Sequence, residues 1–289
     1  MQVHLVDGTY ELYRQHFGQA VRHSKPAPFS ATVGVLNSTL QLLADGATHV
    51  GIAMDHTIES FRNDLYDGYK TSEGMEPEIL EQIPVVADAL EALGFVVWRM
   101  ERYEADDALA SAASVACEDR TVHKVFILSP DKDLAQCVDG KRVVQMDRRN
   151  GTITDEQGVV EKFGIGPSSI PDYLGLVGDT SDGFPGLTGW GPKSASTVLA
   201  KYKTIEQIPD SAAQWSADGV TVRGAEKLAT TLAANRKDAE LFKILATLVR
   251  NVEVGNVSSW KWDGPRGDVE SVLERCNATS VLDRLRRLK

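Results

Sequence analysis

Acidic side chains stand in tight local groups along the chain, and carboxylates at such spacing can hold metal ions or transfer protons. Three groups contain two or more acids each: Glu104-Ala105-Asp106-Asp107, Asp131-Lys132-Asp133 and Asp179-Thr180-Ser181-Asp182. Two single acids, Asp7 and Asp55, each follow a short apolar run. Each feature alone has an ordinary explanation, because acids in the first turn of a helix satisfy free amide groups and complement the helix dipole.

The five features together are harder to explain by helix capping. Several carboxylates gathered without cations would raise one another's pKa values and destabilise the fold, and hard divalent ions remove that penalty. Oxygen-only ligands favour Mg²⁺ or Mn²⁺ over zinc. Two such ions about 4 Å apart are the arrangement used for in-line phosphodiester hydrolysis. The acids therefore predict a metal-dependent nuclease site.

Other catalytic constellations find no support in the sequence. The six histidines are scattered, so no Ser/His/Asp or Cys/His arrangement is indicated. The three cysteines, Cys117, Cys137 and Cys276, are odd in number and widely spaced, which argues against a disulfide framework and a zinc site. No apolar run is long enough to span a membrane, and the N-terminus does not resemble a signal peptide. A cytoplasmic protein that does not contact a membrane is expected.

The apolar runs predict the elements that carry these acids. Residues 3–6, 50–54 and 125–128 are short, rich in β-branched residues and followed by Asp7, Asp55 and Asp131, as expected of buried strands. Two more strands are expected at 96–98 and 143–146. Helical patterns at 32–43 and 79–93 lie between the strands and favour a parallel α/β sheet, in which ligands bind beyond the carboxyl ends of the strands.

The strand pattern stops near Gly164. Residues 186–193 are dense in glycine and proline, and helices are expected at 194–202, 225–249 and 269–288. A domain or subdomain boundary is therefore expected at about residue 164.

The charge balance shows how the chain could bind nucleic acid. The 31 basic and 41 acidic residues give a net charge of −10, which argues against a surface that grips polyanions by charge alone. Nine of the acids belong to the candidate metal set, and residues 184–250 carry nine basic against six acidic residues. Binding would therefore rest on a few placed contacts and on metal, which favours particular DNA shapes over arbitrary sequence.

The motifs closely resemble the 5′-3′ exonuclease and flap endonuclease family, in particular the 5′ nuclease domain of bacterial DNA polymerase I. The most specific segments are Tyr103–Asp107, Asp131–Gln136 and Gly178–Gly186, and the resemblance extends from Val6 to Leu288. It implies a PIN-like α/β catalytic domain over residues 1–165, with a helical arch at about 62–93. A helical subdomain over 166–289, with a helix-hairpin-helix at about 184–202, would follow.

The resemblance also implies a set of metal ligands. The family's acids fall on nine positions here, all of them acidic: Asp7, Asp55, Glu104, Asp106, Asp107, Asp131, Asp133, Asp179 and Asp182. In members of this kind the first six or seven surround one ion, and Asp179 with Asp182 help to hold a second. The implied cofactors are two or more Mg²⁺ or Mn²⁺ ions.

The resemblance places Arg62, Tyr69 and Lys70 at the entry of the arch, where a single-stranded 5′ end would pass. Arg62 and Lys70 would offer cations to the scissile phosphate, and Tyr69 would offer a stacking face for a base. The alternative for Lys70 is a solvated surface lysine. One departure from the polymerase-type pattern is Glu73, which stands where arginine is usual and could weaken contact with the 5′ strand.

The second DNA-facing element implied is the loop from Gly186 to Ser194. Its expected DNA contacts are Gly186, Gly189, Gly191, Lys193 and Ser194, because glycines let backbone amides approach a phosphate and the helix N-terminus adds a favourable dipole. In relatives this motif holds the downstream duplex, often with a bound K⁺. The alternative is an ordinary turn. Gly183 and Trp190 depart from the usual asparagine and smaller aliphatic residue.

The function expected from these features is a structure-selective 5′ nuclease that hydrolyses DNA at 5′ flaps and single-strand/duplex junctions. Expected partners are such DNA, an RNA primer strand and a DNA polymerase acting alongside, and the protein is expected to be a monomer. A non-catalytic junction-binding protein and a PIN-type ribonuclease are the alternatives. The glycine-rich segment 186–193 argues against the ribonuclease, whose chains commonly lack it. The sequence leaves open whether the chain is free-standing or part of a longer polymerase.

Overall fold

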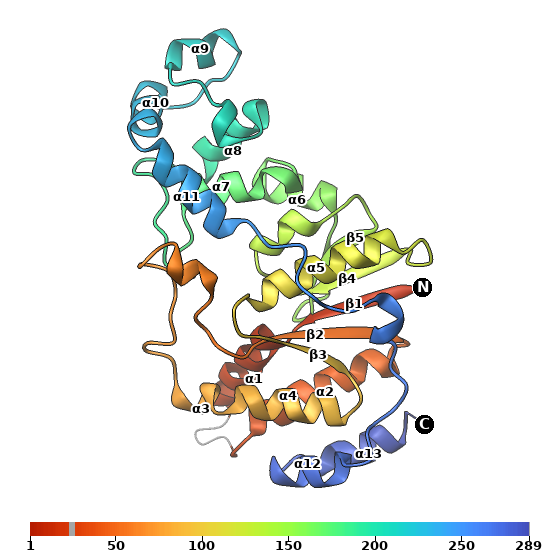
Figure 1. Ribbon diagram of the computed structural model, residues 1–289. Helices are drawn as coiled ribbons and strands as arrows, with labels where there is room; N and C mark the ends of the chain where they lie inside the picture. The colour runs from red at the N-terminus through yellow and green to blue at the C-terminus, as the bar shows by residue number, and fades with distance from the viewer. Residues whose placement is uncertain (23–26, 289) are drawn as a thin grey trace.

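A single six-stranded sheet forms the centre of the first half of the chain. The computed structural model describes residues 1–22 and 27–288 (Figure 1). The strands lie in the order β3-β2-β1-β4-β5-β6. Their bounds are β1 (Gln2–Asp7), β2 (His49–Asp55), β3 (Val96–Met100), β4 (Lys124–Leu128), β5 (Val143–Asp147) and β6 (Thr152–Thr154). The five strands predicted from the sequence are confirmed, and β6 adds a short antiparallel edge strand that was not predicted.

The parallel pairing brings the carboxyl ends of the strands to one edge. β1 pairs with β2 and with β4, and β2 pairs with β3, all in parallel. In this register Asp7 lies opposite Ala53, so Asp7 and Asp55 end neighbouring strands at the same edge. Asp131 follows β4 by three residues. The expected gathering of carboxylates at this edge is therefore built into the topology.

Helices cover both faces of the sheet. On one face lie α1 (Gly8–Arg22), α2 (Ser30–Ala44) and α4 (Gln82–Ala92), and the last two helices, α12 (Val269–Arg275) and α13 (Ser280–Arg286), pack beyond them (Figure 1). On the other face lies α5 (Ala105–Glu118), whose alanines Ala108, Ala112 and Ala116 are buried against the strands. Each strand thus buries side chains on both faces, as its continuous apolar run predicts.

A second hydrophobic core lies among the helices that follow the sheet. These are α6 (Glu156–Phe163), α7 (Ile170–Val177), α8 (Pro192–Tyr202), α9 (Ala212–Ala217), α10 (Ala225–Ala234) and α11 (Arg236–Ala246). The helix expected at 225–249 divides at Asn235, whose φ of −126° ends α10. Residues 269–286 lie within the range 166–289 expected for the helical subdomain, and their Leu273 and Val281 pack in the core of the sheet domain. In the part of the chain described here, no helix is both long and apolar enough to cross a membrane.

The region expected to form a helical arch, at about 62–93, divides into three parts. It contains the short helices η1 (Phe61–Asp64) and α3 (Pro77–Leu80) and then α4. Helix α4 is not part of an arch, because Ile83, Val86 and Leu90 recur at helical spacing and are buried in the core. Between η1 and α3, residues 65–76 form no helix or strand, and we call this segment the strap.

The C-terminal tail crosses back over the sheet domain and is held by backbone contacts. After η5 (Val257–Trp260), the Trp262 amide donates to the Thr48 carbonyl (2.9 Å) and the Trp262 indole donates to the Leu93 carbonyl (2.8 Å). Gly94 lies beneath this tail with φ of +89°, and a Cβ at this position would lie far inside contact distance of the Gly264 carbonyl. The tail therefore requires glycine at position 94 for two reasons, backbone conformation and space.

Substitution of Gly94 tests this packing. We expect Gly94→Ala to lower the free energy of unfolding by about 2–4 kcal/mol, since left-handed strain and a steric clash act together. Gly46→Ala is the matched control, because Gly46 has a similar φ of +95° but open space around its Cα. Only the backbone term, about 1 kcal/mol, should be lost there. Denaturant unfolding measures both, and equal losses in the two variants would contradict the proposed clash.

Candidate active site

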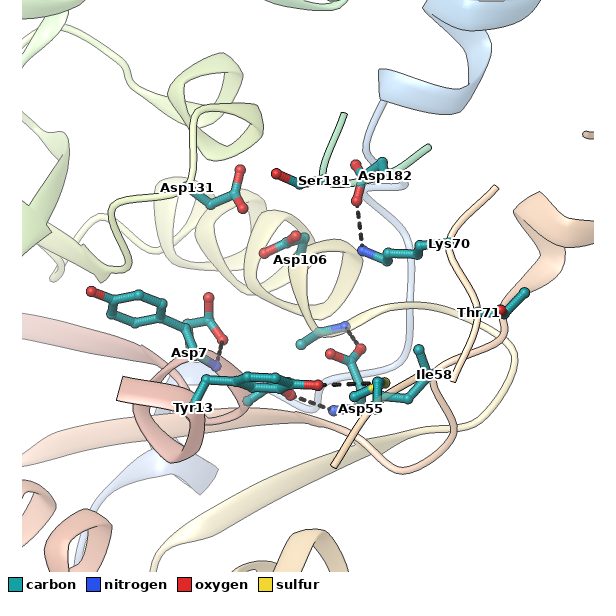
Figure 2. Close-up of a pocket in the computed structure, with 14 residues that line it drawn as sticks. Asp7, Tyr13, Asp55, Ile58, Lys70, Thr71, Asp106, Asp131, Ser181 and Asp182 are labelled. Atoms are coloured by element: carbon teal, nitrogen blue, oxygen red, sulfur yellow. Dashed lines mark hydrogen bonds and ion pairs between the residues drawn. The ribbon is translucent and has the colours of Figure 1, made fainter. Parts of the chain in front are cut away.

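A cavity of about 520 Å³ opens at the carboxyl edge of the sheet. Figure 2 shows the side chains that face it from elements far apart in the sequence. Its acidic lining residues are Asp7 from β1, Asp55 from β2, Asp106 from α5, Asp131 after β4 and Asp182 from the loop after α7. Lys70 from the strap is the basic residue that lines it. The structure thus brings together five of the nine acids expected from the sequence.

Backbone and hydroxyl donors hold the first two carboxylates in place. Asp7 accepts from the Tyr10 amide and from the Ser129 hydroxyl, each at 2.8 Å. Asp55 accepts from the Ala105 amide at 2.7 Å (Figure 2). Strand ends and helix starts are therefore held together through the acids, so the acidic cluster and the local fold share the same contacts.

Neighbouring acids at the start of α5 point in different directions. Asp106 faces the cavity, whereas Asp107 is fully buried and accepts from the two terminal guanidinium nitrogens of Arg62, Nη1 and Nη2, each at 2.8 Å. Successive residues on a helix point about 100° apart, so one of the two must face the interior. The expectation that Asp107 binds metal is therefore wrong in this geometry, because Arg62 donates to both of its oxygens and the Val249 amide donates to Oδ1 as well.

Arg62 is an interior residue rather than a DNA contact. Its side chain is 1% exposed and also donates to Glu104 (3.0 Å) and to the carbonyls of Leu245 (2.7 Å) and Thr247 (3.1 Å). All its nitrogens are engaged, so it cannot reach a phosphate without the loss of buried ion pairs. The expected role of Arg62 at the scissile phosphate is corrected to a structural one.

Tyr69 and Glu104 are also withdrawn from the cavity. Tyr69 is 3% exposed, and its hydroxyl contacts Glu104 (3.3 Å), so it offers no free face for a base. Glu104 is shared among the Ser60 hydroxyl, Arg62 and Lys70. Burial by itself would raise the pKa of Glu104, but Lys70 and Arg62 outweigh that effect and lower it. The expected stacking role of Tyr69 is therefore wrong, and Glu104 is not among the open carboxylates.

Lys70 provides a permanent cation at the wall of the cavity. Its Nζ lies 2.7 Å from Glu104 and 2.9 Å from Asp182. Burial opposes the charged form, yet these two carboxylates raise the pKa of Lys70 well above its ordinary value. The alternative of a solvated surface lysine is therefore excluded.

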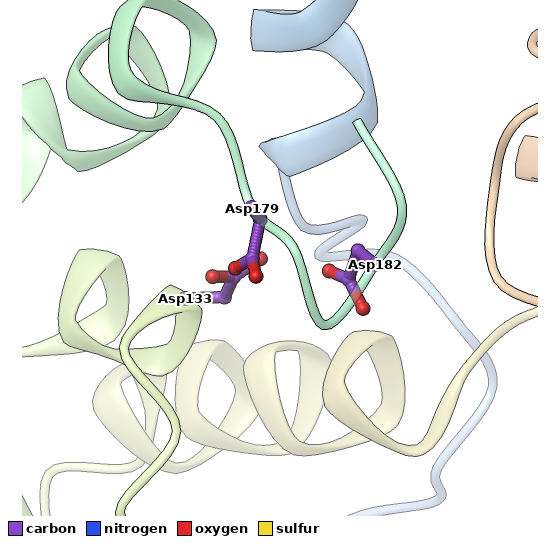
Figure 3. A group of neighbouring side chains, drawn as sticks. All are labelled: Asp133, Asp179 and Asp182. Carbon is purple, nitrogen blue, oxygen red and sulfur yellow. The ribbon is translucent and has the colours of Figure 1, made fainter. Parts of the chain in front are cut away.

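A second acidic group lies beside the first. Asp133, at the start of η2 (Asp133–Cys137), has a carboxylate oxygen within 4.8 Å of those of Asp179 and Asp182 (Figure 3). The Oδ1 atom of Asp133 is buried and has no hydrogen-bond partner among the described residues. Lys132 pairs with Asp179 at 2.7 Å. A set made only of carboxylate oxygens, one of them unpaired, fits a hard divalent cation.

Gathering these acids raises the pKa values of carboxyl groups in both groups. Burial, together with the charges of Asp55 and Asp131, raises the pKa of Asp7 to about 7. Burial and neighbouring acids also raise the pKa values of Asp106 and Asp133 well above the ordinary range. Without a cation the cluster therefore retains protons near neutral pH, and cation binding must displace them.

A second cavity, of about 590 Å³, lies at the glycine-rich loop before α8. Four of the five residues expected to contact DNA line it: Gly189, Gly191, Lys193 and Ser194. The fifth expected contact, Gly186, does not line it, because it packs against the end of α7 at Gly178. Trp190 is buried against Trp215 in the second core (ring centroids 6.0 Å apart), so its large side chain does not obstruct the cavity.

The structure adds residues to both cavities that sequence reasoning missed. Tyr10 and Tyr13 line the first cavity. They stand three and six residues after Asp7, and helical spacing in α1 puts them on the same side as that acid. Thr197, Thr221 and Arg223 line the second. Arg223 lies next to Gly224 between two helices, and this basic turn could have been noticed in the sequence.

Comparison with family models divides the chain at the same place as the change in its architecture. A model described as the 5′-3′ exonuclease N-terminal resolvase-like domain matches residues 2–164. A model described as the 5′-3′ exonuclease C-terminal SAM fold matches residues 165–268.

Individual relatives agree with these models. A 5′-3′ exonuclease of Aquifex aeolicus is 34% identical over 209 residues, which cover 71% of each chain. DNA polymerase I of Bacillus subtilis is 30% identical and matches 97% of this chain, but only 32% of its own length. The chain thus spans about a third of that polymerase.

Two solved structures share the fold. T5 5′-exonuclease with bound zinc ions has a TM-score of 0.68, with 17% identity and coverage of 100% of this chain and 97% of the other. The catalytic core of Rad2 in complex with DNA substrate has a TM-score of 0.62, with 14% identity and coverage of 100% and 92%.

Removal of the buried guanidinium tests the structural role of Arg62. We expect Arg62→Met to lower the free energy of unfolding by about 3–5 kcal/mol, because Glu104 and Asp107 lose their buried partner. Arg99→Met is the control, since Arg99 pairs with Asp88 and Glu91 at a partly exposed site and should contribute no more than about 1 kcal/mol. Denaturant unfolding in EDTA compares them. Similar losses in both variants would refute the role given to Arg62.

Metal binding should stabilise the protein more as pH rises. The raised pKa of Asp7, about 7 against an ordinary 3.8, means that the folded chain holds a proton the unfolded chain has lost. This contribution lowers stability as pH rises from about 4 to about 7. Divalent ions compete with such protons, so Mg²⁺ should raise the melting temperature more at about pH 8 than at about pH 5.

The comparison of melting temperatures with Mg²⁺ and with EDTA must be made at each pH. Burial and Arg148 lower the pKa of His4 to about 4. Below the ordinary pKa of 6.5, the unfolded chain therefore takes up a proton on His4 that the folded chain does not. This lowers stability as pH falls, whereas the shift at Asp7 lowers stability as pH rises. The difference between Mg²⁺ and EDTA cancels that contribution. Asp7→Asn should flatten the pH dependence of the Mg²⁺ effect. An equal Mg²⁺ effect at both pH values in the unmutated chain would contradict the prediction.

Proposed function

Because the chain belongs to the 5′-3′ exonuclease family, whose members are hydrolytic nucleases, we propose that it is a divalent-metal-dependent 5′ nuclease acting on DNA. It hydrolyses phosphodiester bonds at 5′ ends, 5′ flaps and single-strand/duplex junctions. The observation that carries the proposal is the convergence of carboxylates from separate elements on one cavity, with Lys70 among them.

The metal ions are proposed to be Mg²⁺ or Mn²⁺, two or more in number. Asp7, Asp55, Asp106 and Asp131 would hold one, and Asp133, Asp179 and Asp182 would hold a second. Divalent ions supply Lewis-acid chemistry, in which they polarise a phosphodiester and neutralise its developing charge. The DNA-bound Rad2 core and the zinc-bound T5 enzyme share this fold, which supports both ligand classes.

Within the chain, Lys70 is the residue placed to orient the substrate. Its Nζ is fixed by Glu104 and Asp182 at the cavity wall, and a phosphate at the acids would meet that cation. Tyr13 lies on the same wall, with its hydroxyl 3.5 Å from the Met75 sulfur (Figure 2). These side chains position a 5′ nucleotide and exclude part of the surrounding water.

The cavity before α8 is proposed to hold the duplex part of the substrate. Lys193 and Arg223 supply two cations, and the exposed Gly189 lets a phosphate approach the backbone. A K⁺ ion at this loop is part of the proposal. The acidic and basic cavities would then contact the scissile and downstream parts of one DNA molecule.

The proposed cellular role is the removal of 5′ ends during replication and repair. Relatives named DNA polymerase I support a polymerase acting alongside. An RNA primer as part of the substrate also belongs to the proposal. We propose that the protein acts as a monomer on chromosomal DNA in the bacterial cytoplasm.

The purified protein should cut a labelled 5′-flap duplex when Mg²⁺ or Mn²⁺ is present. Asp131→Ala should abolish cleavage while flap binding is largely retained, because Asp131 lines the acidic cavity and not the cavity before α8. Lys70→Met should slow cleavage by about 10²–10³-fold, as expected for a lost charge stabiliser. Lys261→Met, at an exposed ion pair with Asp263, is the control and should not change the rate.

The same assays separate the alternatives. Flap binding without cleavage by either metal would identify a non-catalytic junction-binding protein and overturn the proposal. Cleavage confined to an RNA strand would identify a ribonuclease. Equal losses of binding and rate in Asp131→Ala and Lys70→Met would contradict the roles given to these two residues.

A further inference from the structure

The strap, residues 65–76, is tied to both sides of the active-site cavity. On one side the Lys70 amide donates to the Asp182 carbonyl (2.9 Å), and the Lys70 side chain pairs with Asp182. On the other side the Tyr13 hydroxyl contacts Met75, and His16 contacts Glu76 at 2.7 Å. Lys70, Thr71 and Met75 line the cavity itself. The strap therefore forms a wall fastened at its middle and at its C-terminal end.

Gly183 allows the strap to sit this close. Its φ is +87°, and a Cβ at this position would lie far inside contact distance of the Gly68 carbonyl. Any larger side chain at this position would push the strap away, so the close approach depends on glycine.

The charge of the strap and its flanks is strongly acidic. Residues 59–81 contain seven acids, all exposed, against two bases: Glu59, Asp64, Asp67, Glu73, Glu76, Glu78 and Glu81 against Arg62 and Lys70. Arg62 is buried and Lys70 is paired with Glu104 and Asp182. The exposed face of the segment therefore carries only negative charge.

We propose that the strap is a specificity determinant that restricts the enzyme to 5′ ends with little or no single-stranded overhang. The inference rests on the proposed 5′ nuclease function and narrows its substrate class. A long flap carries one negative charge per nucleotide, and proteins that guide single strands provide positively charged grooves. Here the strap offers carboxylates, and the fastened wall leaves a cavity of about 520 Å³. Such a cavity suits a terminal nucleotide, since sites of this size take ligands of small-molecule dimensions.

Two substrates that differ only in overhang length test this proposal. One is a nicked duplex with a flush 5′ end, and the other carries a single-stranded 5′ flap of about 20 nucleotides, several Debye lengths long. With Mg²⁺, the full chain should cut the flush end about tenfold faster than the long flap at low salt. Raising the salt from about 0.05 to about 0.2 M should narrow this ratio, because salt screens the repulsion.

Charge reversal in the strap should relax the restriction. Glu73→Arg should raise long-flap cleavage relative to flush-end cleavage by about three- to tenfold, and Glu73→Gln should lie between it and the unmutated chain. Asp67→Arg, at another exposed acid of the strap, is a second variant with the same expected direction. Glu274→Arg is the matched control, because Glu274 is exposed on α12, away from the strap.

The outcomes distinguish this inference from the proposed function. If neither substrate is cut with Mg²⁺ or Mn²⁺, the nuclease function fails. If both are cut at equal rates, or if the strap variants change the ratio no more than Glu274→Arg does, the nuclease function stands and the role of the strap is overturned. A salt-independent ratio would also overturn the electrostatic part of the inference.

Discussion

The buried guanidinium of Arg62 is the interaction on which the active-site region depends. It neutralises Glu104 and Asp107 at the start of α5 and also holds the carbonyls of Leu245 and Thr247 after α11. One side chain therefore joins the helix that carries Asp106 to the segment that leads out of the second core. An isolated charge at 1% exposure would be costly, but here every nitrogen has a partner. The relative position of the two cores is set by polar contacts as well as by apolar packing.

The carboxylates of the cavity impose the opposite constraint, because they are gathered without enough cations. Lys70 and Lys132 each pair with an acid of the second group, yet Asp7, Asp106 and Asp133 still have raised pKa values from burial and from one another. The fold tolerates this because strands and helix starts hold the carboxylates through backbone donors. The carboxylates therefore lower stability locally, and the proposed divalent cations would remove this cost.

The sequence predicted where the acids converge, since apolar runs ending in carboxylates define parallel strands with a common edge. It could not predict which of two adjacent acids faces the cavity, because Asp106 and Asp107 differ only by one step of the helix. Arg62 and Tyr69 were misassigned for a related reason: a motif gives residue type and order but not burial, and both side chains turn inward to Glu104. The same applies to α4, whose helical pattern was read correctly but whose apolar face packs in the core and not over an arch.

The net charge of −10 is unevenly distributed along the chain, because two segments carry charge of opposite sign. Residues 184–250 carry a surplus of three positive charges, and the cavity before α8, which Lys193 and Arg223 line, belongs to this segment. The strap and its flanks, part of which lines the acidic cavity, carry a surplus of five negative charges. A polyanion near this molecule is attracted by the first segment and repelled by the second, as far as salt does not screen these charges. DNA would therefore be oriented by charge before any close contact forms, with its duplex toward α8 and its 5′ end toward the carboxylates.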